Sequence, residues 1–258
     1  MAFEFIKVDY DGPITTITLN RPEVMNAINP AMHAELQVAF DDFAADPEQF
    51  IGVVTGAGER AFCAGSDLKA LDRHGGYPKN GYAGLIERFD LAKPLIAAVN
   101  GVALGGGFEI ALACDLIIAS ENASFGLPEP LVGAVALGGG LHRLSRQIGL
   151  KPAMGLILSS RRVSAAEGLR LGFVNEMVPA DQLNTAVRRW CADILRGSPM
   201  SIRASKETVM RGLGEPDVAR AMRNQPTYPA YAAWRASEDA REGPAAFAEK
   251  RPPVWKGR

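Results

Sequence analysis

The chain has 258 residues, of which 47 % are hydrophobic and 22 % are charged, and its formal net charge at pH 7 is −1. This is the composition of a folded globular protein, and the length suffices for one large domain with a full core. The near-neutral charge disfavours nucleic acid or a membrane surface as a partner, and no run of 18 apolar residues predicts a transmembrane helix.

Cysteine and histidine usage gives no indication of a metal site or a disulfide framework. The three cysteines are far apart and form no C-x-x-C pair, which is typical of a reducing compartment: Cys63, Cys114 and Cys191. The three histidines lack metal-ligand spacing, and we expect them on the surface or in loops: His33, His74 and His142. The N-terminus lacks the layout of a signal peptide, so we expect a cytoplasmic protein.

Strands and helices alternate along the first half of the chain. Alternating apolar residues over 3–8 and 14–19, separated by an Asp-Gly-Pro turn, predict a β-hairpin. Pro30 suits the first turn of a helix that we expect to reach Ala45. Short apolar strands are predicted at 51–55, 94–99 and 116–119, each followed by a turn or a helical pattern. This order favours an α/β fold with parallel strands.

Helical patterns dominate after about residue 138. They cover four segments, with one short strand expected near 173–178: 138–158, 164–171, 181–197 and 199–213. The tail, 215–258, reads as helical pieces interrupted by prolines. We therefore divide the chain into a strand-rich core, 1–190, and a helical C-terminal region, 191–258.

Two short motifs match known binding-site or catalytic signatures but lack the surrounding sequence features that those signatures require. Gly56, Gly58 and Ala61 form G-x-G-x-x-A, but the residues that follow make a poor helix start, so a glycine turn is favoured over a dinucleotide site. Ser66 and Lys69 form S-x-x-K, but the partner motifs S-D-N and K-T-G of the penicillin-binding enzymes are absent from the sequence, which disfavours a serine acyl-enzyme.

A glycine triplet, 105–107, follows the strand at 94–99 and precedes an apolar helical run. Glycines leave backbone N–H groups unshielded, and an N–H at a helix N-terminus suits an anionic oxygen. Glu109 is three residues on from Gly106, so it can project from the same face of the first turn. The alternative is a tight turn packed on the sheet, with Glu109 an ordinary first-turn charge.

Two further segments add a donor and an acid. The small residues of A-F-C-A-G-S-D-L-K, 61–69, lie between a buried strand and an expected short helix and leave the N–H of Ser66 as a second donor. Two N–H groups that converge on one point form an oxyanion hole. In S-F-G-L-P-E, Glu129 follows apolar, glycine and proline residues, and half-burial would raise its pKa. Taken alone, Glu129 is more often a surface loop acid.

Together these segments resemble the crotonase (enoyl-CoA hydratase) superfamily. The similar stretches are AFCAGSDLK, AVNGVALGGGFEIALACDLIIAS and FGLPE, and the similarity runs from NRPEVMNAIN to the C-terminus. The resemblance implies a crotonase-like spiral of ββα units within the α/β class, followed by a helical C-terminal trimerisation region. It also implies a homo-oligomer, either a trimer or a dimer of trimers, that acts on an acyl-CoA substrate and needs no cofactor or metal beyond the coenzyme A of the substrate.

The resemblance also implies roles for individual residues. The backbone N–H groups of Ser66 and Gly106 would polarise the thioester carbonyl, while Glu109 and Glu129 would handle the water and the proton at the α-carbon. The substrate or CoA-binding residues would be Ala64 near the adenine, Ser66, Asp67, Leu68 and Lys69 along the coenzyme, and Phe247 and Lys250, often from a neighbouring subunit.

The implied function is hydration of a 2-enoyl-CoA, with three alternatives. The ending SEDAREGPAAFAEKRPPVWKGR is similar to carnitinyl-CoA dehydratases. A double-bond isomerase needs only one glutamate, and a non-catalytic acyl-CoA-binding or RNA-binding member needs neither, so the presence of both favours a hydratase or dehydratase. One departure concerns the loop after the second glutamate, where hydratases usually have G-x-x-P-G-x-G-G-T. Here Ala136 stands in place of the proline and Leu137 in place of a glycine. The sequence therefore does not predict which acyl group the substrate carries.

Overall fold

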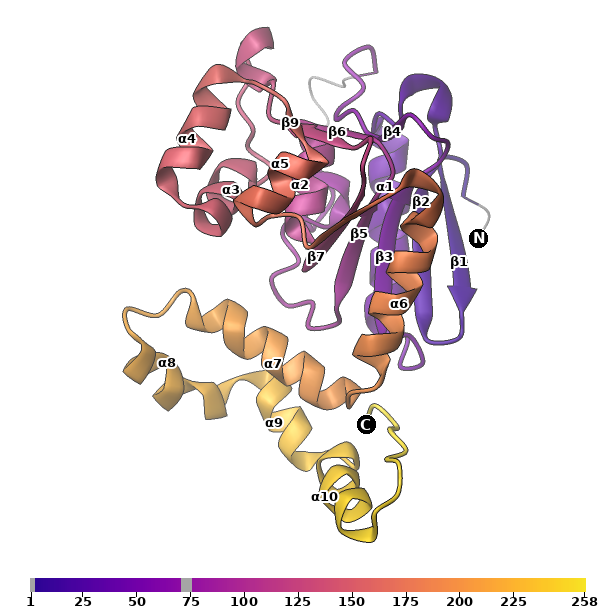
Figure 1. Ribbon diagram of the computed structural model, residues 1–258, viewed down its shortest axis with the longest axis vertical. Coiled ribbons are helices and arrows are strands. Elements are labelled where there is room, and N and C mark those ends of the chain that lie inside the picture. The colour runs from indigo at the N-terminus through magenta and orange to yellow at the C-terminus, as the bar shows by residue number, and fades with distance from the viewer. Residues whose placement is uncertain (1–2, 71–75) are drawn as a thin grey trace.

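A computed structural model describes residues 3–70 and 76–258 and has a mixed α/β architecture with two sheets (Figure 1). The larger sheet has the order β1-β2-β3-β5-β7-β10 and is parallel except for the β1–β2 hairpin. Its strands are β1 (Ile6–Asp11), β2 (Ile14–Leu19), β3 (Ile51–Gly56), β5 (Leu95–Val99), β7 (Leu116–Ser120) and β10 (Glu176–Val178). The smaller sheet contains β4 (Ala61–Cys63), β6 (Val102–Leu104), β8 (Ser124–Gly126) and β9 (Val163–Ser164).

The chain alternates between the two sheets. Three successive pairs, β3–β4, β5–β6 and β7–β8, each place their first strand in the larger sheet and their second in the smaller one. Helix α1 (Pro30–Ala45) follows the β1–β2 pair and α2 (Gly106–Ala113) follows β5–β6. This is the spiral of ββα units that the sequence resemblance implied.

Both faces of the larger sheet are buried. One core contains β2, α1 and α2, with large side chains such as Phe40, Phe43 and Phe108. The other lies under α6 (Leu183–Leu195), where Val187 and Cys191 pack on Ile51 and Ile96. Burial on both sides explains why β5 is an uninterrupted apolar run.

The second half is helical, as expected. Its remaining helices are α3 (Gly140–Ile148), α4 (Leu150–Ser159), α5 (Ala165–Leu171), α7 (Pro199–Gly212), α8 (Val218–Asn224), α9 (Pro229–Ala236) and α10 (Asp239–Glu249). The expected helix at 138–158 is two helices, because Gly149 has φ +82° and interrupts the helical backbone. The division expected near residue 190 falls inside α6.

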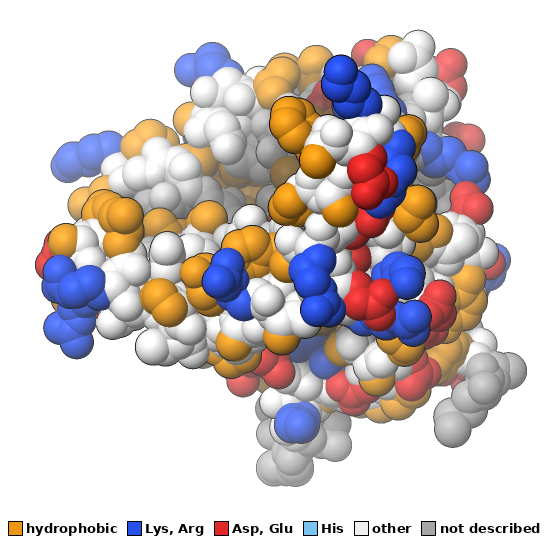
Figure 2. Space-filling view, turned by 90° about the horizontal axis from the view of Figure 1, so that it is seen from below, with side chains coloured by type: hydrophobic (Ala, Val, Ile, Leu, Met, Phe, Trp, Pro, Cys, Tyr) orange, Lys and Arg blue, Asp and Glu red, His pale blue; other side chains and the backbone are white. Residues whose placement is uncertain are grey.

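Helices α7 to α10 extend away from the core (Figure 1). They expose several large apolar side chains: Val209, Met210, Leu213, Val218, Met222 and Phe247. From below, apolar side chains alternate with charged groups of both signs (Figure 2). Within 3–70 and 76–258, none of the helices combines the length and the apolar character that a membrane span needs.

Two sequence expectations need correction. The first strand begins at Ile6 rather than at residue 3. His33 is buried in α1, where its Nδ1 accepts the N–H of Ala83 at 2.9 Å, and burial lowers its pKa to about 4. The short helix expected after the segment 61–69 would begin where residues 71–75 lie outside the described part of the chain, as does His74.

Candidate active site

The ends of three neighbouring strands bring the candidate residues together. Strands β4, β6 and β8 are parallel, and Leu104 of β6 pairs with Gly126 of β8. Their carboxyl ends therefore lie at one edge of the smaller sheet, which is where parallel α/β sheets commonly carry their sites. Ser66 follows β4, Gly106 follows β6 and Glu129 follows β8. The fold thus gathers residues separated by more than 60 positions.

Each glycine of the triplet meets a different steric demand. Gly105 has φ +54° and ψ −127°, a backbone conformation that other residues rarely adopt, and it turns the chain from β6 into α2. A Cβ at Gly106 would collide with the ring of Tyr82, and one at Gly107 with the carbonyl oxygen of Cys63. The tight packed turn describes this segment, and the donor role of the Gly106 N–H stays a prediction.

Glu109 is a buried carboxyl on the first turn of α2. Only 4 % of the residue is exposed, and its Oε1 accepts the N–H of Gly140 at 2.9 Å. Burial raises its pKa to about 7, with a smaller upward contribution from Glu129, while backbone hydrogen bonds from Gly140 and Gly138 lower it. Glu109 is therefore near half-ionisation at neutral pH, which suits a group that exchanges protons. It is not an ordinary first-turn surface charge.

Glu129 begins the short 3-10 helix η3 (Glu129–Val132) directly after β8. Its residue is half-buried, and its Oε2 is buried without a hydrogen-bond partner among the described residues. Burial raises its pKa. A Cβ on Gly105 would approach its Oε1 to 3.1 Å, so the carboxyl lies beside the backbone turn. A buried acceptor without a donor is costly unless a proton or a ligand satisfies it.

The loops after β4 and β6 also bring Gly65, the residue before Ser66, close to Gly106. A Cβ on Gly65 would lie 3.0 Å from the Leu104 carbonyl oxygen and 3.4 Å from the Gly106 nitrogen. Ser66, next in the chain, forms an isolated bridge with Ile28, and its Oγ lies 3.3 Å from the hydroxyl of Tyr82. These contacts place Gly65 beside Gly106 and the Ser66 side chain beside Tyr82.

The expected coenzyme segment is partly occupied by internal contacts. The Ala64 N–H donates to Met25, and Asp67 forms an ion pair of 3.0 Å with Arg21 that lowers the pKa of its carboxyl. Leu68 and Lys69 are exposed. Arg21 has no role in the sequence interpretation, although it stands in the N-R-P turn after β2.

Phe247 and Lys250 are not brought to the carboxyl pair within one chain. Phe247 lies on α10 and is 88 % exposed, and Lys250 ends that helix with φ +55°. Helix α10 packs on α7 and α9, at the opposite end of the molecule from α2 (Figure 1). A second chain would be needed to place them at the site.

The altered loop after Glu129 is apolar and solvent-facing. Leu131, Val132, Val135 and Leu137 are all exposed, and Leu137 is 82 % exposed. The Leu137 N–H donates to the Val135 carbonyl at 2.9 Å, so this backbone donor is already used. A Cβ at Gly140 would lie 2.9 Å from Glu109 Cγ, so the glycines that end this loop leave room for the carboxyl.

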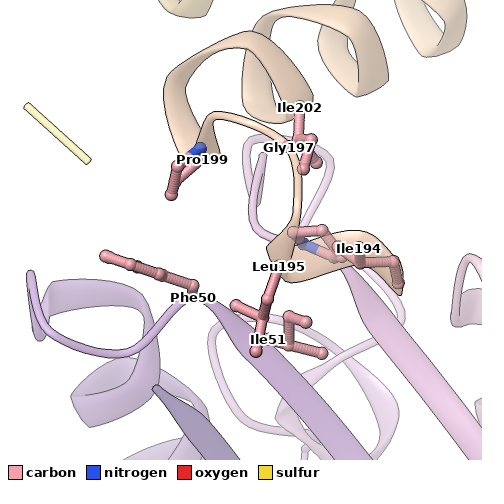
Figure 3. A pocket seen from close by; sticks show the side chains of 8 residues that line it. Phe50, Ile51, Ile194, Leu195, Gly197, Pro199 and Ile202 are labelled. Carbon is pink, nitrogen blue, oxygen red and sulfur yellow. The ribbon is translucent and has the colours of Figure 1, made fainter. Parts of the chain in front are cut away.

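Two hollows elsewhere in the described part of the molecule do not coincide with this site. One, of about 10 Å³, lies among apolar residues where β3, α6 and α7 meet (Figure 3). It has space for at most about one water molecule, so it is a packing defect rather than a ligand site. The other, of about 310 Å³, is lined by Arg88, Lys93 and Arg203, among others. The carboxyl pair and the glycine turn are the better candidate site, because two carboxyls with raised pKa values lie there beside the backbone turn.

Comparison with known proteins identifies the family of the chain. The model of the enoyl-CoA hydratase/isomerase family matches residues 9–258. The chain is 43 % identical to the carnitinyl-CoA dehydratase of Salmonella typhi over 261 residues, with 99 % of each covered. It matches the crystal structure of enoyl-CoA hydratase from Mycobacterium marinum with a TM-score of 0.90 and 39 % identity, covering 98 % of this chain and 99 % of that one. The enoyl-CoA hydratase structure from Bacillus anthracis gives a TM-score of 0.89 and 35 % identity, covering 99 % and 100 %. The chain belongs to the enoyl-CoA hydratase/isomerase family and has the crotonase fold.

Proposed function

We propose that this protein is a hydro-lyase that reversibly adds water to a 2-enoyl-CoA thioester. The observation that carries the proposal is the pair of carboxyls, Glu109 and Glu129, whose pKa values are both raised. They lie beside a backbone turn whose conformation residues other than glycine rarely adopt. The N–H groups of Ser66 and Gly106 are the proposed donors to the thioester oxygen. Coenzyme A enters as part of the substrate, and the proposal includes no resident cofactor.

The chemistry follows from where charge develops. As the water oxygen attacks Cβ, electrons move to the carbonyl oxygen, and two preorganised N–H donors stabilise the resulting enolate. In its ionised form Glu109, held by the Gly140 N–H, orients the water and accepts its proton. Glu129 delivers a proton to Cα, and a proton returns from Glu109 to Glu129 before the next turnover. Because the charge of Glu129 disfavours ionisation of Glu109, the pair favours one ionised and one neutral carboxyl.

A second candidate is dehydration of carnitinyl-CoA, with crotonobetainyl-CoA as the enoyl partner. It is supported by the 43 % identity to proteins named carnitinyl-CoA dehydratase over the whole chain. The same residues would act in both cases, and only the acyl group would differ. A double-bond isomerase is less favoured because this chain has two carboxyls at the site where an isomerase needs one.

The assembly is also a proposal. We infer a homo-oligomer with threefold symmetry, a trimer or a dimer of trimers, in which Phe247 and Lys250 of one chain complete the acyl and CoA site of its neighbour. The exposed apolar residues of α7 to α10 support it. A location in the cytoplasm fits the unpaired cysteines, all three of which are buried.

The test is a panel of 2-enoyl-CoA esters of increasing length, with crotonobetainyl-CoA included, followed by loss of the conjugated-thioester absorbance. The proposal expects hydration of at least one ester, and Glu109→Gln and Glu129→Gln should each slow it by about 10²-fold or more. The double variant should lose far less than the product of the two effects, since groups that act as a unit are non-additive. Full activity of either single variant would show that the two-carboxyl mechanism is wrong.

A further inference from the structure

The turn that carries Tyr82 has an unusual backbone. Gly81 has φ +75° and Gly84 has φ +58°, and between them Ala83 has φ +56°, a left-handed conformation that is unfavourable for a residue with a Cβ. Such conformations persist only where the surroundings enforce them, and they cluster at functional sites. The strained turn at 81–84 is therefore a candidate functional element.

Several contacts hold this turn in place. The N–H of Ala83 donates to Nδ1 of His33 at 2.9 Å, and both groups are buried. The His33 and Tyr82 rings pack edge to face with centroids 4.6 Å apart, and Tyr77 packs on Tyr82 at 5.5 Å. Because the pKa of His33 is lowered to about 4, its ring is neutral and Nδ1 remains an acceptor at neutral pH. The buried histidine therefore fixes the position of Tyr82.

Tyr82 contacts both segments that carry the candidate donors: its ring contacts Gly106 and its hydroxyl contacts Ser66. Its ring lies over Gly106 so closely that no side chain fits there, and its Oη lies 3.3 Å from Ser66 Oγ. The Tyr82 residue is only 3 % exposed. Ser66 donates in this hydrogen bond, and within 3–70 and 76–258 no acceptor receives the Tyr82 proton. A buried phenol whose proton has no acceptor among the described residues thus lies between the Ser66 side chain and the Gly106 backbone.

We propose that the Tyr82 hydroxyl is a third hydrogen-bond donor of the oxyanion site, added by a side chain to the two backbone N–H groups. This inference rests on the proposed function, because it assigns the donor to the thioester oxygen of the same reaction. Burial raises the pKa of Tyr82, with smaller upward contributions from Cys63, Tyr77 and Glu109, so the phenol keeps its proton while the enolate forms. A neutral donor aimed at a developing anion strengthens as charge builds, so it acts on the transition state more than on the bound substrate.

The test compares Tyr82→Phe with the matched control Tyr77→Phe. Phenylalanine keeps the ring packing on Gly106 and His33 and removes only the hydroxyl. Tyr77 belongs to the same aromatic cluster but is 62 % exposed and shows no hydrogen bond of its hydroxyl among the described residues. Tyr82→Phe should lower kcat by about tenfold or more with KM changed less than threefold, while Tyr77→Phe should match the parent. A kcat for Tyr82→Phe within twofold of the parent would overturn the inference.

A spectral measurement tests the donor independently of turnover. Hexadienoyl-CoA is a conjugated thioester whose absorbance shifts to longer wavelength when its carbonyl oxygen is polarised. The bound ligand should show a smaller red shift in Tyr82→Phe than in the parent and in Tyr77→Phe, at saturating enzyme. An equal red shift in all three proteins would refute the role of Tyr82 even if the parent hydrates no enoyl-CoA. A smaller shift in a protein without hydratase activity would support the donor and reject the proposed reaction.

Discussion

Replacement of Glu109 by glutamine should stabilise the fold at the expense of activity. The carboxyl has an ordinary pKa of 4.5 and a folded-state pKa of about 7. Between these two values the native state holds a proton that the unfolded chain has lost, so stability falls as the pH rises through this window. One pKa unit corresponds to about 1.4 kcal/mol, so above pH 7 the buried carboxylate costs about 3 kcal/mol of folding free energy.

Glutamine removes this cost because it is neutral at every pH and its carbonyl oxygen can still accept the Gly140 N–H. At pH 8 we expect Glu109→Gln to raise Tm by about 5 °C or more, since 1 kcal/mol shifts Tm by roughly 2–4 °C in a chain of this size. At pH 4.5 both proteins carry a neutral side chain in the native state, so the gain should shrink to near zero.

The assay is thermal unfolding followed by circular dichroism between pH 4.5 and 8, with enoyl-CoA hydration measured on the same samples. Glu121→Gln is the matched control, because Glu121 is an exposed carboxyl in the turn between β7 and β8. It should leave both Tm and its pH dependence unchanged. A Glu109→Gln variant that is no more stable than the parent at pH 8 would refute the burial argument, and one that hydrates normally would refute the catalytic role.

Four further outcomes are expected. In the parent protein, kcat/KM should fall on the acid side of about pH 7 as Glu109 is protonated, and a pH–rate profile that is flat from pH 5 to 8 would contradict this. Gly138→Ala should cost at least tenfold in kcat, because a Cβ there collides with the Glu109 carboxylate, whereas Gly155→Ala on α4, where a Cβ meets open space, should be silent in the same assay. Light scattering should give a mass of three or six chains at micromolar concentration, and a monomer would contradict the proposed assembly. Deletion of residues 240–258 should raise KM more than it lowers the Tm of the core, and an unchanged KM would exclude Phe247 and Lys250 from the substrate site.

Local sequence patterns determined most of the elements. The period-2 and all-apolar runs correctly predicted β2, β3, β5 and β7, because strands buried on one or both faces must carry those patterns. Pro30 correctly marked the start of α1. The glycine triplet and the two glutamates were also recognisable, since a backbone turn without side chains leaves a sequence signature. The paired sheets and the spiral came from family resemblance, because strands of three residues such as β4, β6 and β8 have too few positions to show a period.

Tertiary structure alone decided what the buried polar groups do. In the sequence, His33 is a histidine without metal spacing and Tyr82 is one aromatic residue in a polar stretch, and neither has a local pattern that indicates burial. Their surroundings form because the turn at 81–84 packs against His33 of α1, some 50 residues earlier, and against Gly106. The same holds for the pKa of Glu109, which follows from its burial under the loop ending at Gly140 rather than from its neighbours in the chain. Electrostatic and steric effects depend on distance in space, and that distance is set only when the chain has folded.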